Sequence, residues 1–348
     1  MKAHKKAPKS LPFTWPIIII SERFYSYINP INKGKHLRPE EEAGNRQDGR
    51  RHRAGLFHFI FFISALFVML SAETSCAADV YARAAVVIDD KEEILYAKNP
   101  DLKLPPASTT KLITAMVALD KLNPDSMVTV SRKAADTPSV QPHLRAGDNI
   151  SVRDLLNFAL IRSINGAAIA LAESAAGSEN SFVPLMNEKA LSVGALNTRF
   201  INASGLPGKG QHTTARDLAR IMKKALSYPL IAEIIDTKVK ALDVDGKTIL
   251  LTNTNNLLWD DDDHLGGKTG YTRAARHCFV GASSKEEGVI IIALLGDSSR
   301  NTLWTDAEKL LAKDFEKGTI IITDQKSYKV KPRRVNRSRT RRSRTKSL

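Results

Sequence analysis

A serine and a lysine lie three residues apart in the segment Pro105-Pro-Ala-Ser-Thr-Thr-Lys-Leu112, and this pair has the spacing of a nucleophile and its base. Two prolines precede Ser108, a residue type favoured at helix caps, so the sequence predicts a helix that begins at or beside it. Residues three apart on a helix have Cβ atoms about 5–6 Å apart, which puts the Ser108 hydroxyl within reach of Lys111. The alternative is an ordinary helix cap followed by a solvated charge.

The helix after this pair gives the lysine an unusual setting. Residues Leu112 to Leu119 are apolar on every face, which is typical of a helix buried inside a domain. Lys111 lies in the first turn, where the helix dipole and burial both disfavour its ammonium form, and a neutral amine there could accept a proton. The same spacing recurs at Ser343 and Lys346 in the basic tail, so the spacing alone is not specific.

Two further stretches carry polar residues where the local pattern needs none. Ser163-Ile-Asn165 lies in a predicted break between two helices, and Lys268-Thr-Gly270 lies at the head of a predicted strand. Ser-x-Asn also begins at Ser178 and at Ser299, whereas Lys-Thr-Gly occurs once. The order and the combination of the three motifs are therefore more informative than any one of them.

The set, with separations of 55 and 105 residues, resembles the active-site triplet of the penicillin-recognising serine acyltransferases. The strings A-S-T-T-K-L-I-T-A, S-I-N-G-A-A-I-A-L-A-E and G-G-K-T-G-Y-T look like those of the low-molecular-mass penicillin-binding proteins, specifically D-alanyl-D-alanine carboxypeptidases. The resemblance extends over roughly residues 80–315. It implies an enzyme that removes the terminal D-alanine from peptidoglycan pentapeptide stems through an acyl-enzyme, needs no cofactor and is acylated by β-lactams.

The resemblance also implies roles for the first two motifs. Ser108 would attack the carbonyl of the penultimate D-alanine, and Lys111 would take the hydroxyl proton, although related enzymes leave the identity of the base in dispute. Ser163 would relay the proton to the leaving amine. Asn165 would orient Lys111 or hold the substrate amide.

The third motif is expected to hold the substrate. Lys268 would supply positive potential and Thr269 a hydroxyl near the substrate carboxylate. Gly270 would let the substrate backbone lie against the strand edge. By analogy with the family, the backbone N–H groups of Ser108 and Tyr271 would form the oxyanion hole.

The match has departures from the family pattern. Ile164 stands where a small residue is more usual, Gly166 where aspartate is frequent, and Arg276 where glycine is frequent. The arginine that should bind the terminal carboxylate is not fixed by a motif. Arg300 is our candidate and Arg273 competes with it, the alternative for either being a solvated surface charge.

Other readings of the chemistry stay open. A D,D-endopeptidase that cuts cross-links is an alternative within the family. A β-lactamase would share the nucleophile, but no Glu-x-x-x-Asn signature lies between Asn165 and Lys268. The acidic run Asp260–Asp263 lacks the alternating ligand pattern of a calcium loop, and His212 and His277 lack ligand partners at metal spacing, so we expect no metal site.

The net charge of +15 belongs to the ends of the chain. Residues 1–55 hold 12 basic against 5 acidic residues and residues 326–348 hold 11 against none, which leaves residues 56–325 slightly acidic. The acidic charge of the folded part, together with the secretory signal described below, argues against nucleic acid as a partner. A non-enzymatic protein that binds anionic polymers through its basic tail is the alternative function from a different class. We expect the tail to contact anionic lipid or wall polymer, or to have no specific partner.

Residues 1–78 have the pattern of an N-terminal extension and a secretory signal. Basic residues at 50–53 precede an apolar run at 56–70, and small residues follow that would allow cleavage before Ala78 or before Asp79. The chain is therefore predicted to be exported to the periplasm or another extracytoplasmic space, with a translation start that could lie after Met1. Loss of the signal would leave Cys278 as the sole cysteine.

The mature chain predicts an α+β fold. Strand-like residues directly after Asp79 form a hairpin, helices follow in the middle, and the last third returns to strands that include Val289–Gly296 before a final helix at Leu303–Phe315. We therefore expect an antiparallel sheet built from N- and C-terminal strands with a helical cluster, as in serine β-lactamases and DD-peptidases. The expected domain is 79–322, and 323–348 is expected to be a disordered basic tail.

Overall fold

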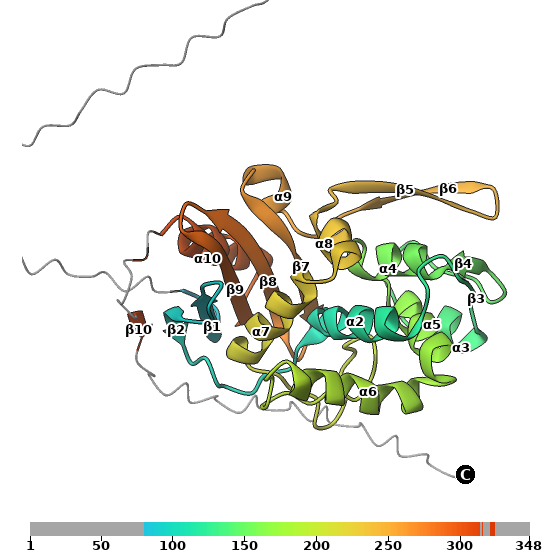
Figure 1. Ribbon diagram of the computed structural model, residues 1–348, viewed down its shortest axis with the longest axis horizontal. Helices are drawn as coiled ribbons and strands as arrows, with labels where there is room; N and C mark the ends of the chain where they lie inside the picture. The colour runs from blue at the N-terminus through green and yellow to red at the C-terminus, as the bar shows by residue number, and fades with distance from the viewer. Residues whose placement is uncertain (1–79, 314, 316–320, 324–348) are drawn as a thin grey trace, which may run out of the picture. The chain divides into compact units, whose positions relative to one another are not determined.

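The computed structural model describes residues 80–313, 315 and 321–323 (Figure 1). The predicted extension and signal at 1–78, and residues 324–348 of the predicted tail, lie outside the described residues. Within the described part, no helix combines the length and the apolarity that a membrane span requires.

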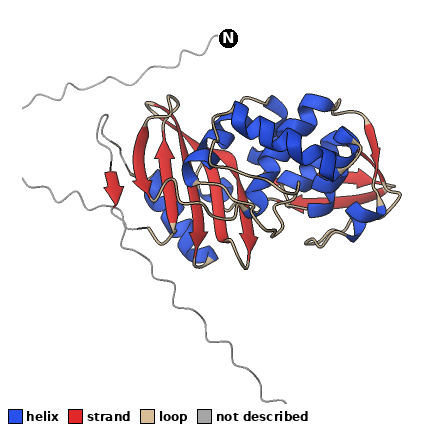
Figure 2. Cartoon of the chain, turned by 90° about the horizontal axis from the view of Figure 1, so that it is seen from below, coloured by secondary structure: helices blue, strands red, loops and turns tan. Residues whose placement is uncertain are grey.

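A six-stranded sheet joins the two ends of the described chain, in the strand order β10-β2-β1-β9-β8-β7 (Figure 2). Five strands pair antiparallel, whereas the short β10 runs parallel to β2. The predicted α+β fold with a sheet of N- and C-terminal strands is therefore confirmed, with β10 as the parallel exception. The strands are β1 Ala84–Ile88, β2 Ile94–Lys98, β7 His264–Thr272, β8 Arg276–Lys285, β9 Gly288–Asp297 and β10 Ile321–Thr323.

Both faces of the sheet are covered, which explains why its central strands are apolar at nearly every position. On β1, Val86 and Ile88 contribute to the larger core, whereas Ala85 and Val87 contribute to a smaller one, because successive side chains of a strand point to opposite faces. The smaller core also contains the apolar side of α10, Arg300–Leu311. The sheet is thus held from both sides.

Helix α2, Lys111–Lys121, packs against α4, α5, α6 and α7, and its residues 111–118 are all buried (Figure 1). This confirms the prediction of a helix buried inside the domain. The other helices are α3 Arg132–Asp136, α4 Val152–Leu160, α5 Asn165–Ala176, α6 Glu179–Ser192, α7 Ala215–Leu226, α8 Pro229–Asp236 and α9 Leu257–Asp260.

The sequences Ser151-Val-Arg-Asp154 and Thr214-Ala-Arg-Asp217 predict two capped helix starts, and both are confirmed, whereas a cap at Ser108 is wrong. Ser151 and Thr214 cap α4 and α7, each accepting a hydrogen bond from the backbone N–H three residues on. Ser108 does not cap α2, because a short 3-10 helix, η2, Ala107–Thr110, precedes α2 and contains Ser108. The helical segment does begin beside Ser108, as predicted, but one turn of tighter helix presents the serine.

The turn-forming residues between 128 and 150 predict short strands and loops, but this segment also contains α3. A hairpin that was not predicted forms between residues 239 and 252. Helix α3 is five residues long, which is too short for a hydrophobic period to show. The two-stranded sheets are β3 Met127–Thr129 with β4 Asn149–Ser151, and β5 Val239–Val244 with β6 Lys247–Thr252.

Boundaries differ from the prediction near the third motif and at both ends of the last helix, which ends at Leu311 rather than Phe315. Lys268 lies in the middle of β7 rather than at its head. Helix α10 begins at Arg300 rather than Leu303, because Ser299 and Thr302 form a reciprocal capping box that starts the helix one turn earlier. Arg300 is therefore the first residue of a helix.

A close approach of two loops fixes η2 in place. Gly205 has φ +84°, and a Cβ built there would lie 1.8 Å from the carbonyl oxygen of Ala107 and 2.9 Å from Thr110 Oγ1. Only glycine allows this contact, since both the backbone conformation and the space exclude a side chain. The loop at 202–205 therefore packs directly on the turn that carries Ser108.

Replacing Gly205 by alanine should destabilise the protein more than the same change at Gly246. Gly246 has φ +70° and open space around it, so Gly246→Ala is expected to cost about 1–2 kcal/mol of conformational strain. Gly205→Ala adds a clash with backbone and should cost at least about 2 kcal/mol more. Urea unfolding of the two variants measures the difference, and an equal loss at the two positions would contradict the contact.

Candidate active site

Ser108 lies in η2, directly before the N-terminal end of α2, and is partly exposed, while its neighbours Ala107 and Thr109 are buried. Ala107 has φ +49°, in the left-handed region that strains a residue with a side chain. This turn places the Ser108 hydroxyl 2.9 Å from Lys111 Nζ. The structure thus brings the predicted pair into direct contact.

The Lys111 amine has a set of partners that suits its neutral form. Nζ lies 2.7 Å from Asn165 Oδ1 and 2.7 Å from the carbonyl oxygen of Ser204, both of which accept hydrogen bonds. The Asn165 amide is oriented by its own Nδ2, which donates to Pro138 O at 2.6 Å. A neutral amine has two N–H donors and one lone pair, so these two carbonyl-type acceptors leave the lone pair for the hydroxyl of Ser108.

Electrostatics favours the same form. Burial lowers the pKa of Lys111 well below its ordinary value, and the nearby positive charge of Lys268 lowers it further. The direction agrees with the expectation from the sequence, and the second lysine supplies a cause that spacing along the chain did not indicate. Lys111 is thus poised to accept a proton.

The second motif lies between α4 and α5, as predicted. Ser163 has φ +67°, a strained conformation for a residue with a side chain, and its Oγ accepts a hydrogen bond from Lys268 Nζ at 3.0 Å. Asn165 is the first residue of α5, and its backbone N–H donates to Ser139 Oγ at 2.9 Å. One turn of chain therefore directs the Ser163 side chain to Lys268 and the Asn165 side chain to Lys111.

Lys268 is fully buried on β7 and serves as the second cation of the site. Its Nζ donates to Ser163 Oγ and to the carbonyl oxygen of Thr269, each at 3.0 Å. Burial lowers the pKa of Lys268 from 10.5 to about 7. Near neutral pH this lysine is therefore divided between its charged and neutral forms.

Gly270 packs against the turn that carries the serine. A Cβ built on Gly270 would lie 2.9 Å from Ser108 N and 3.0 Å from Ala107 Cβ. Glycine is thus needed for contact between β7 and η2, a reason separate from the predicted approach of a substrate backbone. The next residue, Tyr271, has a side chain 59% exposed, whose ring stacks on His277 with centroids 4.5 Å apart.

The structure connects Arg300 to the third motif. Thr269 Oγ1 lies 2.6 Å from Thr254 Oγ1, and Arg300 Nη2 donates to Asn256 Oδ1 at 3.1 Å and to Thr254 O at 3.5 Å. Arg273 is exposed, and within the described part of the chain it makes no hydrogen bond or ion pair with these residues. Of the two predicted arginines, Arg300 is the one beside Thr269.

The three departures from the family pattern lie in different structural settings, and only the absence of a side chain at Gly166 is explained by packing. Ile164 is fully buried between the two site residues that flank it. A Cβ on Gly166 would lie 2.5 Å from the carbonyl oxygen of Ala134, so the packing of α3 excludes a side chain there. Arg276 has φ +64°, the conformation that glycine adopts without strain.

Sequence reasoning missed three contributors to the site. Ser204 contributes a backbone carbonyl, Ser139 a hydroxyl and Thr254 the link between the third motif and Arg300. The string N-A-S-G at 202–205 was a signal for the first, because a glycine after a polar run indicates a tight approach. Ser139 and Thr254 lie in stretches whose letters are ordinary for loops.

A buried series of hydrogen bonds fixes the loop at residues 254–256, which contacts Arg300. His264 Nε2 accepts from Asn255 Nδ2 at 2.8 Å, and its Nδ1 lies 3.0 Å from Ser283 Oγ, which donates to Asp261 at 3.5 Å. Burial lowers the pKa of His264 to about 4, so the ring is neutral and its Nδ1 carries the proton. Thr254 and Asn256, which accept hydrogen bonds from Arg300, flank Asn255, so these hydrogen bonds fix their position.

Cys278 lies beside the third motif, on the strand next to it. It opposes Gly270 in the pairing of β7 with β8, it is buried, and its Sγ is 3.9 Å from Pro105 O. Burial raises the pKa of the Cys278 thiol to about 12. The thiol is therefore a packing group between β8 and the segment that leads into the serine turn.

Among the described residues, no group of three or more histidine, cysteine, aspartate or glutamate side chains is placed to hold a metal ion. Asp260–Asp263 closes a turn, in which Asp261 accepts from Asp263 N at 3.0 Å. His212 contacts the carbonyl oxygen of Gly210 at 2.9 Å, and His277 packs on the Tyr271 ring.

Three features together define the class of serine acyltransferases with a Ser-x-x-Lys pair. They are a serine beside the start of a buried helix, a buried lysine of lowered pKa in contact with it, and a Ser-x-Asn turn opposite a Lys-Thr-Gly strand. The chain belongs to the D-alanyl-D-alanine carboxypeptidase family, whose model matches residues 71–299. Members of the family act on the cell wall outside the cytoplasm, and peptide substrates and β-lactams are typical of them.

Curated relatives include both kinds of DD-peptidase. The chain is 34% identical to the D-alanyl-D-alanine endopeptidase of Pseudomonas aeruginosa over 70% of this chain and 84% of the relative. It is 36% identical to the D-alanyl-D-alanine carboxypeptidase DacC of Escherichia coli over 72% of this chain and 66% of the relative. The relatives thus support a DD-peptidase. They do not decide between a carboxypeptidase, which releases a terminal D-alanine, and an endopeptidase.

Solved structures support the fold. The D-alanyl-D-alanine carboxypeptidase of Mycobacterium tuberculosis matches 69% of this chain and 93% of its own, with 32% identity and a TM-score of 0.65. The Streptomyces K15 DD-transpeptidase matches 67% of this chain and 96% of its own, with 29% identity and a TM-score of 0.64. The predicted DD-peptidase-like fold is therefore confirmed.

The rate of acylation by penicillin should have a bell-shaped pH dependence. It rises with pH as Lys111 loses its proton and becomes a base, and it falls above about pH 7 as Lys268 loses the charge that attracts the carboxylate of penicillin. Stopped-flow acylation from pH 5 to 10 measures both limbs. Lys268→Arg, which stays charged, should move the alkaline limb upward by at least one pH unit; an unmoved limb would assign it to another group.

Proposed function

We propose that this chain is a serine-type DD-peptidase that removes the terminal D-alanine from peptidoglycan pentapeptide stems through an acyl-enzyme on Ser108. The observation that carries the proposal is the contact of 2.9 Å between the Ser108 hydroxyl and a buried Lys111 amine whose pKa is lowered. Family membership supports the reaction class.

In the acylation step, Ser108 Oγ attacks the carbonyl carbon of the penultimate D-alanine while Lys111 takes its proton. The lone pair of Lys111 faces the hydroxyl because the two N–H groups are held by Asn165 and Ser204. The backbone N–H groups of Ser108 and Tyr271 are proposed to stabilise the oxyanion, which the close contact of Gly270 with the serine turn supports.

The proton must then reach the leaving amine. Ser163 is proposed to relay it, since its hydroxyl is hydrogen-bonded to Lys268 at 3.0 Å and Asn165, two residues further on, contacts Lys111. Water afterwards hydrolyses the ester, which restores the Ser108 hydroxyl and releases the shortened stem as a carboxylic acid. Lys111 is the proposed base in this second step as well.

Binding of the terminal carboxylate is assigned to Lys268, Thr269 and Arg300. Lys268 gives positive potential beneath the site, Thr269 offers its hydroxyl, and the Arg300 guanidinium is joined to Thr269 through Thr254. Gly270 and Tyr271 would border the substrate backbone.

Three alternative functions can be distinguished from this proposal by experiment. A D,D-endopeptidase uses the same acylation step on a cross-linked stem, and two endopeptidases are among the relatives. A β-lactamase would differ in rapid hydrolysis of the penicilloyl ester. A binder of anionic polymers working through the basic tail would form no ester.

We further propose that the catalytic domain spans residues 79–322, behind an N-terminal extension and signal at 1–78 and ahead of a basic tail at 323–348. The pattern of residues 50–79 supports export to the periplasm or another extracytoplasmic space. The tail is proposed to contact anionic lipid or wall polymer.

Incubation with penicillin should add one penicilloyl group to the protein, and Ser108→Ala should abolish the mass shift, because the ester forms on that hydroxyl. Intact-protein mass spectrometry measures this. Ser343→Ala, which alters the other Ser-x-x-Lys sequence, is the matched control and should keep the shift. A wild-type protein without any shift would remove the enzyme proposal, and rapid decay of the adduct would favour a β-lactamase.

Arg300→Gln should remove the preference for a free C-terminal carboxylate. Hydrogen bonds to charged groups contribute about 1.5–3 kcal/mol, which corresponds to about a 10- to 100-fold loss in kcat/KM for D-alanine release from a pentapeptide. The pentapeptide C-terminal amide should lose much less. Arg273→Gln is the control and should behave as wild type; the reverse pattern would assign the carboxylate to Arg273.

A further inference from the structure

Lys111 is oriented by two hydrogen-bond acceptors, and a separate loop carries or holds each of them. Asn165 Oδ1 and Ser204 O both lie 2.7 Å from Lys111 Nζ. The first acceptor belongs to the Ser-x-Asn motif, whereas the second is a backbone carbonyl outside the three motifs. The residues that fix this carbonyl therefore bear on how the base is oriented.

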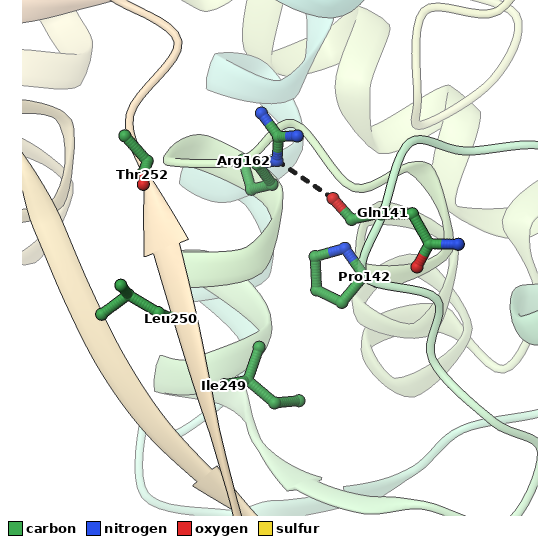
Figure 3. Close-up of a pocket in the computed structure, with 6 residues that line it drawn as sticks. All are labelled: Gln141, Pro142, Arg162, Ile249, Leu250 and Thr252. Carbon is green, nitrogen blue, oxygen red and sulfur yellow. Dashed lines mark hydrogen bonds between the residues drawn. The ribbon is translucent and has the colours of Figure 1, made fainter.

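The loop beside the Ser-x-Asn motif holds the first acceptor. Asn165 Nδ2 donates to Pro138 O at 2.6 Å, and Arg162 Nε donates to Gln141 O at 3.0 Å in the same loop. Figure 3 shows the second contact, with Arg162 between Gln141 and the Thr252 end of β6. The motif and the loop are thus tied together at two points.

Helix α2 binds two consecutive carbonyl groups of the loop that carries the second acceptor. Lys111 Nζ donates to Ser204 O, and Thr114 Oγ1 donates to Ala203 O, each at 2.7 Å. Lys111 and Thr114 are three residues apart on the helix and so share a face. Thr114 is fully buried, and the other oxygen near its hydroxyl, Thr110 O, lies at 3.5 Å. The bond to Ala203 is therefore the stronger contact of this hydroxyl.

The N–H group of Ala203 is held by a carboxylate. Ala203 is buried, and its N–H donates to Glu179 Oε1 at 3.0 Å. Glu179 is the first residue of α6, and its other oxygen pairs with Lys133 Nζ at 2.8 Å. The Lys133 side chain is 54% exposed, so this ion pair contributes little. Side chains thus satisfy both backbone polar groups of Ala203.

The loop depends on such contacts for its shape. Residues 201–204 form bends rather than a helix or a strand, and Asn202 Oδ1 accepts a hydrogen bond from Gly205 N at 2.7 Å. Contacts with side chains therefore set the direction of the carbonyl groups in this segment. Loss of one of them would let the Ser204 carbonyl turn away from α2.

We infer that Thr114 and Glu179 are positioning residues for the acylation step. Together they fix Ala203, and through it they hold the carbonyl of Ser204 where it accepts a hydrogen bond from Lys111. Neither residue touches a reacting atom, so each acts only through the loop. This inference rests on the proposed acylation of the serine with Lys111 as the base.

The consequence for the reaction concerns the direction of the lone pair on Lys111. Release of the Ser204 carbonyl frees one N–H of the amine, which can then donate to the Ser108 hydroxyl instead of accepting its proton. In acylation by penicillin, Ser108 Oγ bonds to the lactam carbonyl carbon, the C–N bond of the ring breaks, and the hydroxyl proton passes through Lys111 to the ring nitrogen. A misdirected lone pair slows this step and leaves the binding of penicillin unchanged.

Thr114→Val keeps the shape of the side chain and removes its hydroxyl. It should lower the first-order rate constant of acylation about tenfold, while the dissociation constant of the initial benzylpenicillin complex stays within about twofold of wild type. Thr114→Ser keeps the hydroxyl and should recover most of the rate. Rapid-quench mass spectrometry of the full-length protein at several benzylpenicillin concentrations measures both constants.

Thr213→Val is the matched control. Thr213 is as buried as Thr114, but its hydroxyl contacts Thr198 Oγ1 at 2.8 Å instead of the loop. Both valine variants should lower Tm by a few degrees, since each loses a buried hydrogen bond, but only Thr114→Val should lose acylation rate. Equal kinetic losses in the two variants would assign the effect to general destabilisation and overturn the inference.

Glu179 gives an independent arm of the test, which also applies where Thr114→Val fails to fold. Glu179→Ala should lower the acylation rate constant at least about threefold. Glu179→Gln keeps an oxygen that accepts from Ala203 N, and Lys133→Gln removes only the ion pair, so both should acylate at close to the wild-type rate. Equal losses in all three variants would assign the effect to the ion pair and overturn the role of Ala203.

The outcomes separate this inference from the proposed function. Normal acylation of wild type together with unchanged rates in Thr114→Val and Glu179→Ala would overturn the inference and keep the proposed function. A fall in penicillin binding with no fall in the acylation rate constant would also overturn it. Absence of acylation in wild type would remove the proposed function, and the inference with it.

Discussion

The site depends on the exclusion of water from one amine. Lys111 has no exposed surface, and its burial, rather than any single partner, lowers its pKa. Helix α2 provides this environment because it lies inside the helical cluster with its polar first residue directed at Ser108 and Asn165. Unfolded lysine has a pKa near 10.5, so folding this residue in a neutral form opposes stability, and the packing of the surrounding helices must offset that cost.

Strain is concentrated at the same place. Ala107 and Ser163 adopt left-handed conformations that side chains disfavour, and Gly205 and Gly270 allow backbone to press on the serine turn from two sides. A turn confined in this way has little freedom to move its hydroxyl. The close contacts thus hold Ser108 and Lys111 at bonding distance before any substrate arrives, which lowers the reorganisation that acylation requires.

Much of this was predictable from the sequence because it depends on local patterns. The apolar helix after Ser108, the break at Ser163 and the strand with Lys268 each follow from period and cap residues. The hairpin beside Arg162 was missed, since alternation over six residues is easily hidden by charged positions, and Thr254 was missed because its role comes from contacts across the chain. The second lysine's effect on Lys111 likewise requires knowing that residues 157 positions apart are neighbours in space.

The position of Cys278 has a consequence for the durability of the site. Its thiol lies beside Gly270 on the face of the sheet that packs against the serine turn, 3.9 Å from Pro105 O, so a bulky or charged adduct on sulfur would press on that turn. With its pKa raised to about 12, the thiolate that oxidants and disulfides attack is nearly absent at neutral pH, and burial blocks their access. The site therefore carries a cysteine next to its nucleophile, and burial together with a raised pKa protects that thiol from oxidation.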